Sequence, residues 1–250
     1  MSRVGRKVIA VPKDVKVQVA ERALSIQGPR GKLQSPVPPG ISFKLTGTEL
    51  SCLRSNDEQQ QRDGRWLGGG VPRPPIEDGD FTRTALGIRA LTQYAPPGRM
   101  TELTGRARRA AAWLHGAKPL TSEDRAFRLM GLTWGGADPA SRADAARDII
   151  ARQRADGGWS QRDEMGSDAY ATGLVLYALE ESGSAPSARV VAHATRYLLA
   201  TQRADGSWYV RSRSAKFQPY FDGGFPYEHD QWISSMATGW ATAALALSAN

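Results

Sequence analysis

The 250-residue sequence predicts a mainly α-helical fold of paired helices, preceded by a small antiparallel β unit. Short stretches before residue 56 alternate apolar and polar residues, as half-buried strands do. After residue 60, two sequence patterns recur at helix-pair intervals, which is typical of stacked repeats. The composition also changes between the two parts. Residues 1–56 contain 10 Lys and Arg against 3 Asp and Glu, whereas all seven Trp and all seven Tyr lie after residue 60.

Charge and composition limit the classes of protein that fit. The positive charge of residues 1–56 favours a polyanionic partner such as RNA, and the Trp-rich remainder favours a packed core or an apolar ligand site. No run of about 18 apolar residues occurs, so we expect no membrane span. The basic N-terminus lacks an apolar segment of signal-peptide length, so we expect a cytoplasmic location. The single cysteine, Cys52, excludes an intramolecular disulfide and a cysteine zinc cluster, and we expect neither a metal nor a cofactor.

The first part of the chain predicts short strands joined by turns. Apolar residues alternate with polar ones at Val15, Val17 and Val19, at Leu24 and Ile26, at Ile41, Phe43 and Leu45, and at Leu50 and Cys52. The segments 28–31 and 36–40 are rich in Gly and Pro, which is typical of turns. We expect one antiparallel sheet with one apolar face, which no helix covers before Asn56.

Several blocks of this part occur in the order found in one family: residues 2–7 (SRVGRK), 11–17 (VPKDVKV), 28–31 (GPRG), 38–40 (PPG) and 53–57 (LRSND). They resemble the N-terminus of bacterial large-subunit ribosomal protein six, over about residues 1–58. Members of that family carry two copies of an α/β unit, and this sequence matches part of the first. The resemblance implies contact with ribosomal RNA, where Lys and Arg at strand ends and turns touch phosphates. The candidate RNA-binding residues are Arg3, Arg6, Lys7, Lys13, Lys16, Arg30 and Lys32.

The second part of the chain contains two interleaved repeats. In one, Gln and Trp stand six residues apart with Asp-Gly between them, in segments 60–66, 153–159 and 202–208. In the other, Asp80, Asp124 and Asp168 are each 44 residues apart, and each opens an apolar helix. A further helix of this inner type runs from residue 232 to residue 247. Outer helices are expected near residues 103–116, 142–153 and 188–202, so that each helix pair buries its face against the next.

The Gln-to-Trp segments resemble the QW repeats of squalene-hopene cyclases and protein prenyltransferase β-subunits, over about residues 59–250. The resemblance implies a partial α/α toroid of inner and outer helices. Together, the two resemblances predict two domains, residues 1–58 and residues 59–250. In the QW repeat the Gln side chain ties helix ends together and the Trp stacks over them. The structural residues implied in this way are Gln60, Trp66, Gln153, Trp159, Gln202 and Trp208.

The catalytic motifs of these families are degenerate or absent. The cyclase motif is Asp-x-Asp-Asp-Thr-Ala, in which neighbouring carboxylates hold one Asp as a proton donor. The nearest match is residues 78–82 (DGDFT), where Phe81 replaces the last Asp. We interpret Asp80 as a helix N-cap, with a proton donor as the alternative. Prenyltransferases need a zinc-binding Asp, Cys and His set, and residues 59–250 contain no Cys. The sequence therefore favours a protein without enzymatic activity.

The segment 217–232 is the most unusual stretch of the chain. Five aromatic residues precede Trp232, and the segment leads into an inner helix. Glu228, His229 and Asp230 are candidates for an acid–base or metal constellation, which Asp80 or Asp168 would join. The alternative is a loop that packs its rings on the rim of the toroid.

Three functions are compatible with the sequence. The first is a truncated RNA-binding segment joined to a non-catalytic toroid that binds an apolar or isoprenoid small molecule, or a protein partner. The second is a component of the large ribosomal subunit that binds ribosomal RNA. The third is a terpene-cyclase-like enzyme with a degenerate acid motif. Both resemblances are partial and meet near residues 57–60, so the chain looks like a fusion of two partial genes.

Overall fold

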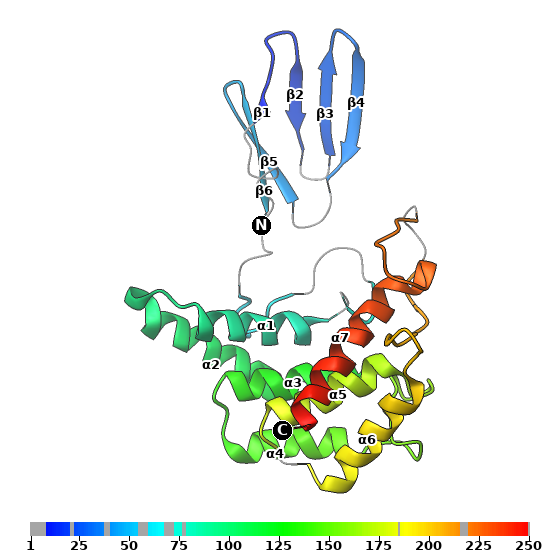
Figure 1. Ribbon diagram of the computed structural model, residues 1–250. Helices are drawn as coiled ribbons and strands as arrows, with labels where there is room; N and C mark the ends of the chain where they lie inside the picture. The colour runs from blue at the N-terminus through cyan, green and yellow to red at the C-terminus, as the bar shows by residue number, and fades with distance from the viewer. Residues whose placement is uncertain are drawn as a thin grey trace. The chain divides into compact units, whose positions relative to one another are not determined.

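The computed structural model describes residues 9–20, 23–37, 41–54, 60–67, 73–76, 79–184, 186–215 and 220–249. The chain divides into two compact units, residues 1–59 and residues 60–250. Strands build the first unit and helices build the second (Figure 1). The mainly α-helical fold class with a small antiparallel β unit is therefore confirmed.

The β unit contains two antiparallel sheets of three strands, where the sequence predicted one. One sheet has the order β2 (Lys16–Val19), β3 (Ala23–Gly28), β4 (Gly31–Pro36), and the other has the order β1 (Ile9–Ala10), β6 (Glu49–Arg54), β5 (Ile41–Thr46). The expectation of a single sheet was wrong because a turn separates β1 from β2. In this turn Val15 N donates to Pro12 O at 3.0 Å, and β1 then pairs with β6 while β2 pairs with β3.

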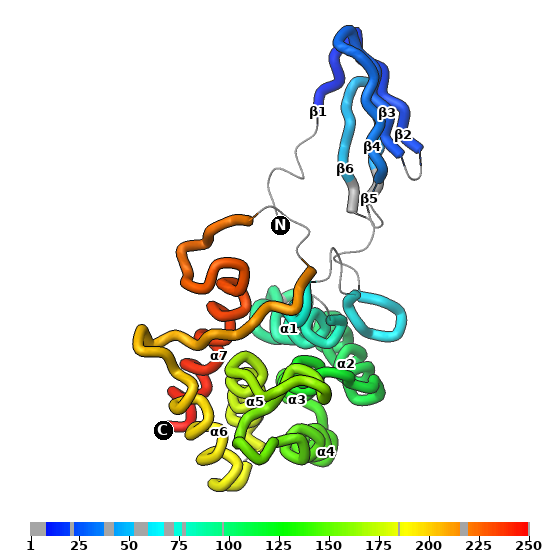
Figure 2. The backbone as a smooth tube through the Cα atoms, turned by 90° about the vertical axis from the view of Figure 1, so that its right-hand side faces the viewer, coloured from blue at the N-terminus to red at the C-terminus, as the bar shows by residue number. Residues whose placement is uncertain are grey.

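Strand β4 was not predicted, because its sequence does not alternate apolar and polar residues. It is formed by pairing with β3 along its whole length, from Pro36 opposite Ala23 to Gly31 opposite Gly28. The tube in Figure 2 shows β2, β3 and β4 side by side. A small core of Leu24, Val37 and Leu50 stabilises the unit, with Val11, Val17, Ile26 and Phe43 packed against it.

The helical unit consists of two rows of helices. The inner row is α1 (Asp80–Gln93), α3 (Ser122–Trp134), α5 (Ala169–Glu181) and α7 (Gln231–Ser248), and the outer row is α2 (Met100–Gly116), α4 (Pro139–Ile150) and α6 (Ala188–Thr201). Successive inner helices pack against each other, and each outer helix packs on the inner helix that precedes it in the chain. Short 3-10 helices, η2 (Pro97–Arg99) and η3 (Glu228–Asp230), lead into α2 and α7. The predicted positions of the helices are thus confirmed to within a few residues.

The three aspartates of the 44-residue repeat open their helices in different ways. Asp168 is the N-cap of α5 and accepts a hydrogen bond of 2.8 Å from Ala171 N. Asp124 is the third residue of α3, in its first turn, where it forms a capping box with the N-cap Thr121. The interpretation of Asp80 as an N-cap was wrong, because the N-cap of α1 is Gly79. The repeated Asp therefore lies at the start of each helix, but it is the N-cap residue of only one of the three.

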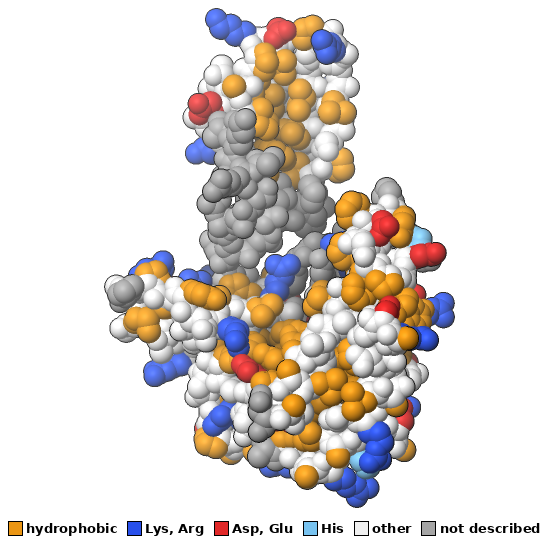
Figure 3. All heavy atoms as spheres, viewed as in Figure 1, with side chains coloured by type: hydrophobic (Ala, Val, Ile, Leu, Met, Phe, Trp, Pro, Cys, Tyr) orange, Lys and Arg blue, Asp and Glu red, His pale blue; other side chains and the backbone are white. Residues whose placement is uncertain are grey.

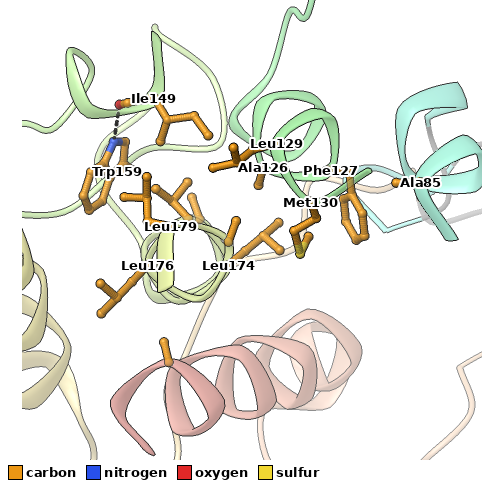
Figure 4. Packing of buried hydrophobic residues seen from close by; sticks show 14 of the residues in the cluster. Ala85, Ala126, Phe127, Leu129, Met130, Ile149, Trp159, Leu174, Leu176 and Leu179 are labelled. Carbon is orange, nitrogen blue, oxygen red and sulfur yellow. Dashed lines mark hydrogen bonds between the residues drawn. The ribbon is translucent and has the colours of Figure 1, made fainter. Parts of the chain in front are cut away.

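Helix α5 lies at the centre of the helical core, between α3 and α7 (Figure 4). Its side chains are buried on several sides, among them Leu174, Leu176 and Leu179, because α6 packs against it as well. Helices α5 and α7 approach closely at Gly173, where a Cβ atom would lie 2.6 Å from Ala241 N. The apolar periodicity of α5 is weak for this reason, since ten of its thirteen residues are buried and only a few positions near its C-terminus are partly exposed.

Among the helices that the structure describes, none combines the length and apolar character needed to cross a membrane.

Candidate functional site

One face of the β2–β3–β4 sheet carries polar side chains in its paired rows. Lys16 of β2 lies opposite Gln27 of β3, which lies opposite Lys32 of β4. Directly opposed residues project to the same face of an antiparallel sheet, so these three side chains form one row. The next row on this face is Gln18, Ser25 and Gln34. The two rows offer ammonium, amide and hydroxyl groups and contain no carboxylate.

The candidate RNA-binding residues of the described segments gather at one end of this sheet. Lys13 precedes β2, and Arg30 lies in the β3–β4 turn, directly before β4. Lys13, Lys16, Arg30 and Lys32 are all exposed. Arg30 and Lys32 also line a groove of about 680 Å³, together with Asp14. Positive groups at strand ends and turns are suited to phosphate contact. Three further candidates, Arg3, Arg6 and Lys7, lie outside the described residues.

The Gln side chains of the three repeat segments make related hydrogen bonds in the helical unit. Gln153 Nε2 donates at 3.0 Å to the backbone oxygen four residues later, and at 3.0 Å to Val190 O on α6. Gln60 repeats both bonds, at 2.7 Å and 2.8 Å, the second to Arg106 O on α2. Gln202 makes the first of these bonds, at 3.0 Å. The Gln of the first two segments thus ties the loop before an inner helix to the outer helix that follows.

The Trp residues of these segments are held by hydrogen bonds to the neighbouring helices, Trp159 and Trp208 at both ends of the loop. Trp159 N donates to Thr172 Oγ1 at 2.9 Å and Trp208 N to Thr238 Oγ1 at 3.1 Å, each on the next inner helix. Trp66 N makes the same kind of bond, at 3.0 Å, with a threonine of α1. The indole nitrogens of Trp159 and Trp208 donate to backbone oxygens ten residues earlier, at 2.9 Å and 2.8 Å. Figure 4 shows the bond of Trp159, which reaches the end of α4. These contacts give the segments a structural role.

A buried carboxyl group lies where three inner helices begin. Glu123 on α3 accepts hydrogen bonds from Thr82 Oγ1 on α1 and from Tyr170 OH on α5, both at 2.8 Å. Glu123 is only 6% exposed, and burial raises the pKa of its carboxyl to about 7. At neutral pH this group is therefore able to give or to take a proton.

Asp168 and Arg213 extend the network around this carboxyl. Asp168 Oδ2 accepts a hydrogen bond of 2.9 Å from Gln161 Nε2, and Gln161 Oε1 accepts one of 2.8 Å from Arg213 Nε. Burial raises the pKa of the Asp168 carboxyl above its ordinary value. Glu123 and Arg213 line a cavity of about 350 Å³ together with Arg162 and Glu164. We call Thr82, Glu123, Gln161, Asp168, Tyr170 and Arg213 the polar cluster. Its cavity suits a small polar molecule, because charged groups of both signs line it.

The other candidate catalytic residues have separate partners. Asp80 forms an ion pair of 3.1 Å with Arg65. In the turn before α7, Asp230 accepts hydrogen bonds from Tyr209 OH at 2.8 Å and from Ser212 N at 2.9 Å. Glu228 and His229 are exposed. Of the five candidates only Asp168 belongs to the polar cluster, and no three His, Cys, Asp or Glu within the described ranges are grouped like metal ligands. Residues 216–219 of the unusual segment lie outside the described residues.

Glu123 and Tyr170 were missed by reasoning from the sequence. The 44-residue spacing drew attention to Asp124 and Asp168. The two residues of the buried carboxyl–tyrosine pair are their neighbours: Glu123 comes directly before Asp124, and Tyr170 comes two residues after Asp168. The available signal was an acidic pair, Glu123-Asp124, at a helix start. Only one of two consecutive carboxylates is needed for the capping box, so the other is available for a different role.

Aromatic side chains also connect three inner helices. The ring of Trp240 on α7 lies 5.2 Å from that of Tyr177 on α5 and 6.3 Å from that of Phe127 on α3. We call Phe127, Tyr177 and Trp240 the aromatic group. Trp240 Nε1 is buried, and among the described residues it has no hydrogen-bond acceptor. Hydrophobic side chains also gather between α1 and α7 on the face that Figure 3 shows.

Comparison with known proteins supports the resemblance of the N-terminal region to a ribosomal protein. The large ribosomal subunit protein uL6 of Maridesulfovibrio salexigens is 39% identical over 62 residues, which are 25% of this chain and 35% of that protein. The uL6 of Syntrophomonas wolfei is 40% identical over 62 residues, with the same coverage, and that of Geobacter sulfurreducens is 36% identical over 67 residues, 27% of this chain and 37% of that protein. The chain thus spans about a third of the length of these relatives. No model of a protein family matches it. The resemblance of residues 59–250 to QW-repeat proteins stays a prediction.

Proposed function

We propose that the β unit binds ribosomal RNA. The observation that carries this proposal is the row Lys16, Gln27, Lys32. It places two ammonium groups two strand spacings apart, which is roughly 10 Å. The paired rows on this face of the sheet contain no carboxylate. Lysines contact phosphates, and the neighbouring amides and hydroxyls donate to or accept from sugars and base edges. The similarity to uL6 supports ribosomal RNA as the partner. Such a partner is found in the cytoplasm.

Binding of the full chain to transcribed large-subunit ribosomal RNA, measured by filter retention, tests this proposal. One variant replaces four cations of the β unit by Gln, at Lys13, Lys16, Arg30 and Lys32. The control variant makes the same change of charge on exposed positions of the helical unit, at Arg108, Lys118, Arg147 and Arg189. We expect the first variant to bind at least tenfold more weakly and the control to bind like the unmodified chain. An equal loss in both variants would mean that only the overall charge matters.

The aromatic group supports a second function, for the helical unit. We propose that this unit binds an apolar molecule that carries one hydrogen-bond acceptor, such as an isoprenoid alcohol. The aromatic rings supply apolar contact area, and the unpartnered Trp240 Nε1 supplies a donor in a site where an unsatisfied polar group is costly. This proposal concerns binding and includes no chemical step.

Titration with farnesol, followed by tryptophan fluorescence, tests this second function. Trp240→Phe keeps the ring but removes the donor, so we expect binding to weaken about tenfold, the value of one buried hydrogen bond. Trp232→Phe is the matched control, because Trp232 lies on the same helix and is 58% exposed. Binding that does not saturate, or that is unchanged in Trp240→Phe, would remove the aromatic group as a ligand site.

A further inference from the structure

The cavity that Glu123 lines contains charged groups of both signs. Its walls come from four segments of the helical unit: the residues before α1, the start of α3, the loop between α4 and α5, and the loop between α6 and α7. The charged lining residues are Glu123, Asp124, Arg162, Asp163, Glu164 and Arg213. Among the described lining residues only Pro75 and Leu120 are apolar. The cavity therefore suits a small ligand that is itself charged or polar, because an apolar ligand would leave these groups without partners.

The carboxyl group of Glu123 has acceptor positions beyond those that the described residues fill. Its two oxygens each accept one hydrogen bond, from Thr82 Oγ1 and from Tyr170 OH, whereas an ionised carboxylate has about four acceptor positions. Burial outweighs these two bonds and the attraction of Arg213, so the pKa of the carboxyl is raised to about 7. A ligand that brings a positive charge and further N–H donors would therefore stabilise the ionised form.

The other carboxylates of the cavity already have partners or face water. Asp124 Oδ2 accepts from Leu120 N at 2.9 Å and from Thr121 N at 3.0 Å, as part of the cap of α3. Glu164 Oε1 lies 3.8 Å from Arg162 Nη1 in an exposed ion pair. Asp163 is exposed as well. Glu123 is therefore the lining carboxyl that gains most from a cation in the cavity, because the others are capped or solvated.

Two guanidinium groups give the cavity a part that attracts anions. Arg213 Nε donates to Gln161 Oε1 at 2.8 Å, and Gln161 Nε2 donates to Asp168 at 2.9 Å, so the polar cluster holds Arg213 in position. Arg162 directly follows Gln161 in the chain. The planar fork of a guanidinium group can donate two parallel hydrogen bonds to one carboxylate. The cavity thus combines a buried acceptor, Glu123, with donors that suit a carboxylate.

We propose that this cavity binds a small zwitterion, a molecule with one ammonium group and one carboxylate group, such as a free amino acid. The ammonium group donates to Glu123, and the carboxylate accepts from the guanidinium groups of Arg162 and Arg213. A second positive charge in the ligand would meet these guanidinium groups, and a second negative charge would meet the lining carboxylates, so one charge of each sign fits best. The cavity is separate from the aromatic group, none of whose residues lines it.

Glu123 should release its proton when the ammonium group binds, because the added positive charge favours the ionised carboxyl. Besides the charged lining residues, Asp80 on α1 and Asp168 and Tyr170 on α5 lie on the helices that pack against α3. Asp80 is paired with Arg65. Burial raises the pKa of the Tyr170 phenol well above its ordinary value, so this group stays protonated at neutral pH. Burial also raises the pKa of Asp168, so a variant of Glu123 is needed to assign the proton.

Calorimetric titration of the full chain with ω-amino acids, from glycine to 6-aminohexanoate, tests the proposal. The two charges of these probes lie progressively further apart, and we expect at least one probe to bind saturably. The diamine and the dicarboxylate of the same length should bind at least tenfold more weakly than this probe. The affinity of the probe should rise about tenfold from pH 6 to pH 8, because a carboxyl with a pKa of about 7 is mostly protonated at pH 6 and mostly ionised at pH 8.

Two variants and their controls complete the test. Glu123→Gln should weaken binding about tenfold at pH 8 and abolish its pH dependence, whereas Glu102→Gln, at an exposed position of α2, should change neither. Arg162→Gln should weaken binding about tenfold, whereas Arg147→Gln on α4 should have no effect. Arg162 is exposed, so its variant serves if Glu123→Gln fails to fold.

Three results would overturn the proposal. The first is that no ω-amino acid binds saturably. The second is that the diamine or the dicarboxylate binds as tightly as the best ω-amino acid. The third is a pH dependence that survives in Glu123→Gln, which would assign the proton to another group such as Asp168.

Discussion

The hydroxyl group of Tyr170 on α5 donates a hydrogen bond of 2.8 Å to the carboxyl group of Glu123 on α3. This bond joins two inner helices at their first turns, and Thr82 on α1 adds a third helix to the same carboxyl. The site is dry enough to raise the pKa of Glu123 to about 7 and that of the Tyr170 phenol well above its ordinary value. The contacts among the first turns of α1, α3 and α5 therefore depend on whether the Glu123 carboxyl is protonated.

This link predicts that stability falls as the pH rises. The Glu123 carboxyl has a higher pKa in the folded chain than its ordinary value of 4.5, so the folded chain holds this proton more tightly than the unfolded chain. The stabilisation is complete below about pH 4.5 and is lost as the pH rises through about 7. We expect ionisation of Glu123 to make the free energy of unfolding about 2 kcal/mol smaller at pH 8 than at pH 5.

Urea unfolding of Glu123→Gln at pH 5 and pH 8 measures this contribution. The difference between the two pH values should shrink by about 2 kcal/mol in the variant, because the amide does not ionise. Glu102→Gln is the control, since the pKa of Glu102 is lowered by Arg99 and this group stays ionised across the window. A pH dependence unchanged by Glu123→Gln would show that this carboxyl is ionised in the folded chain.

The tryptophans of the second and third repeat segments should be stability anchors. Trp159 and Trp208 are each 1% exposed, so we expect Trp→Ala at either position to cost about 3–5 kcal/mol, from lost burial and the cavity left behind. Trp232→Ala, at a largely exposed position, should cost less than about 1 kcal/mol. Thermal melts give the comparison. Losses well below 1 kcal/mol at both Trp159 and Trp208 would contradict the repeat assignment.

The glycines of the same segments should respond differently to a methyl group. Gly157 and Gly206 have similar positive φ angles, so Ala at either position carries similar backbone strain. Only at Gly157 does the new Cβ meet a helix backbone, His193 O at 2.5 Å. We expect Gly157→Ala to destabilise the chain by about 2 kcal/mol more than Gly206→Ala. Equal losses of unfolding free energy in the two variants would mean that α6 shifts away from the new methyl group at Gly157 without loss of stability.

Binding of ribosomal RNA should depend steeply on salt. Each phosphate neutralised by a cation releases counterions, so the logarithm of the binding constant falls linearly with the logarithm of salt concentration. Replacing Lys13, Lys16, Arg30 and Lys32 by Gln should reduce the magnitude of this slope by about 3. Charge reversal at Arg3, Arg6 and Lys7 should weaken binding further. Binding that does not change with salt, or no binding at low salt, would exclude RNA as the partner of the β unit.

Much of the helical unit could be predicted from the sequence, whereas the arrangement of the strands could not. Helices α5 and α6 follow from apolar periodicity and from residues such as Asp168 that start a helix, and both signals lie within a few neighbouring positions. Strand β4 has no such signal, because its conformation comes from pairing with β3. The division into two sheets likewise depends on which strand β1 meets, and that partner, β6, lies about 40 residues away.

The sequence by itself determined where the helices lie, how they repeat and which residues open each loop of the repeat, since these properties depend on local spacing and turn chemistry. Only the tertiary structure decided which polar residues act together. It gave Asp80 and Asp168 different partners, paired Glu123 with Tyr170, and placed a helix backbone against Gly157 but, among the described residues, none against Gly206. The physical reason is that burial and hydrogen bonding between distant segments determine the proton affinity of a carboxyl group and the exposure of a glycine. Neither property is encoded in the residues beside it.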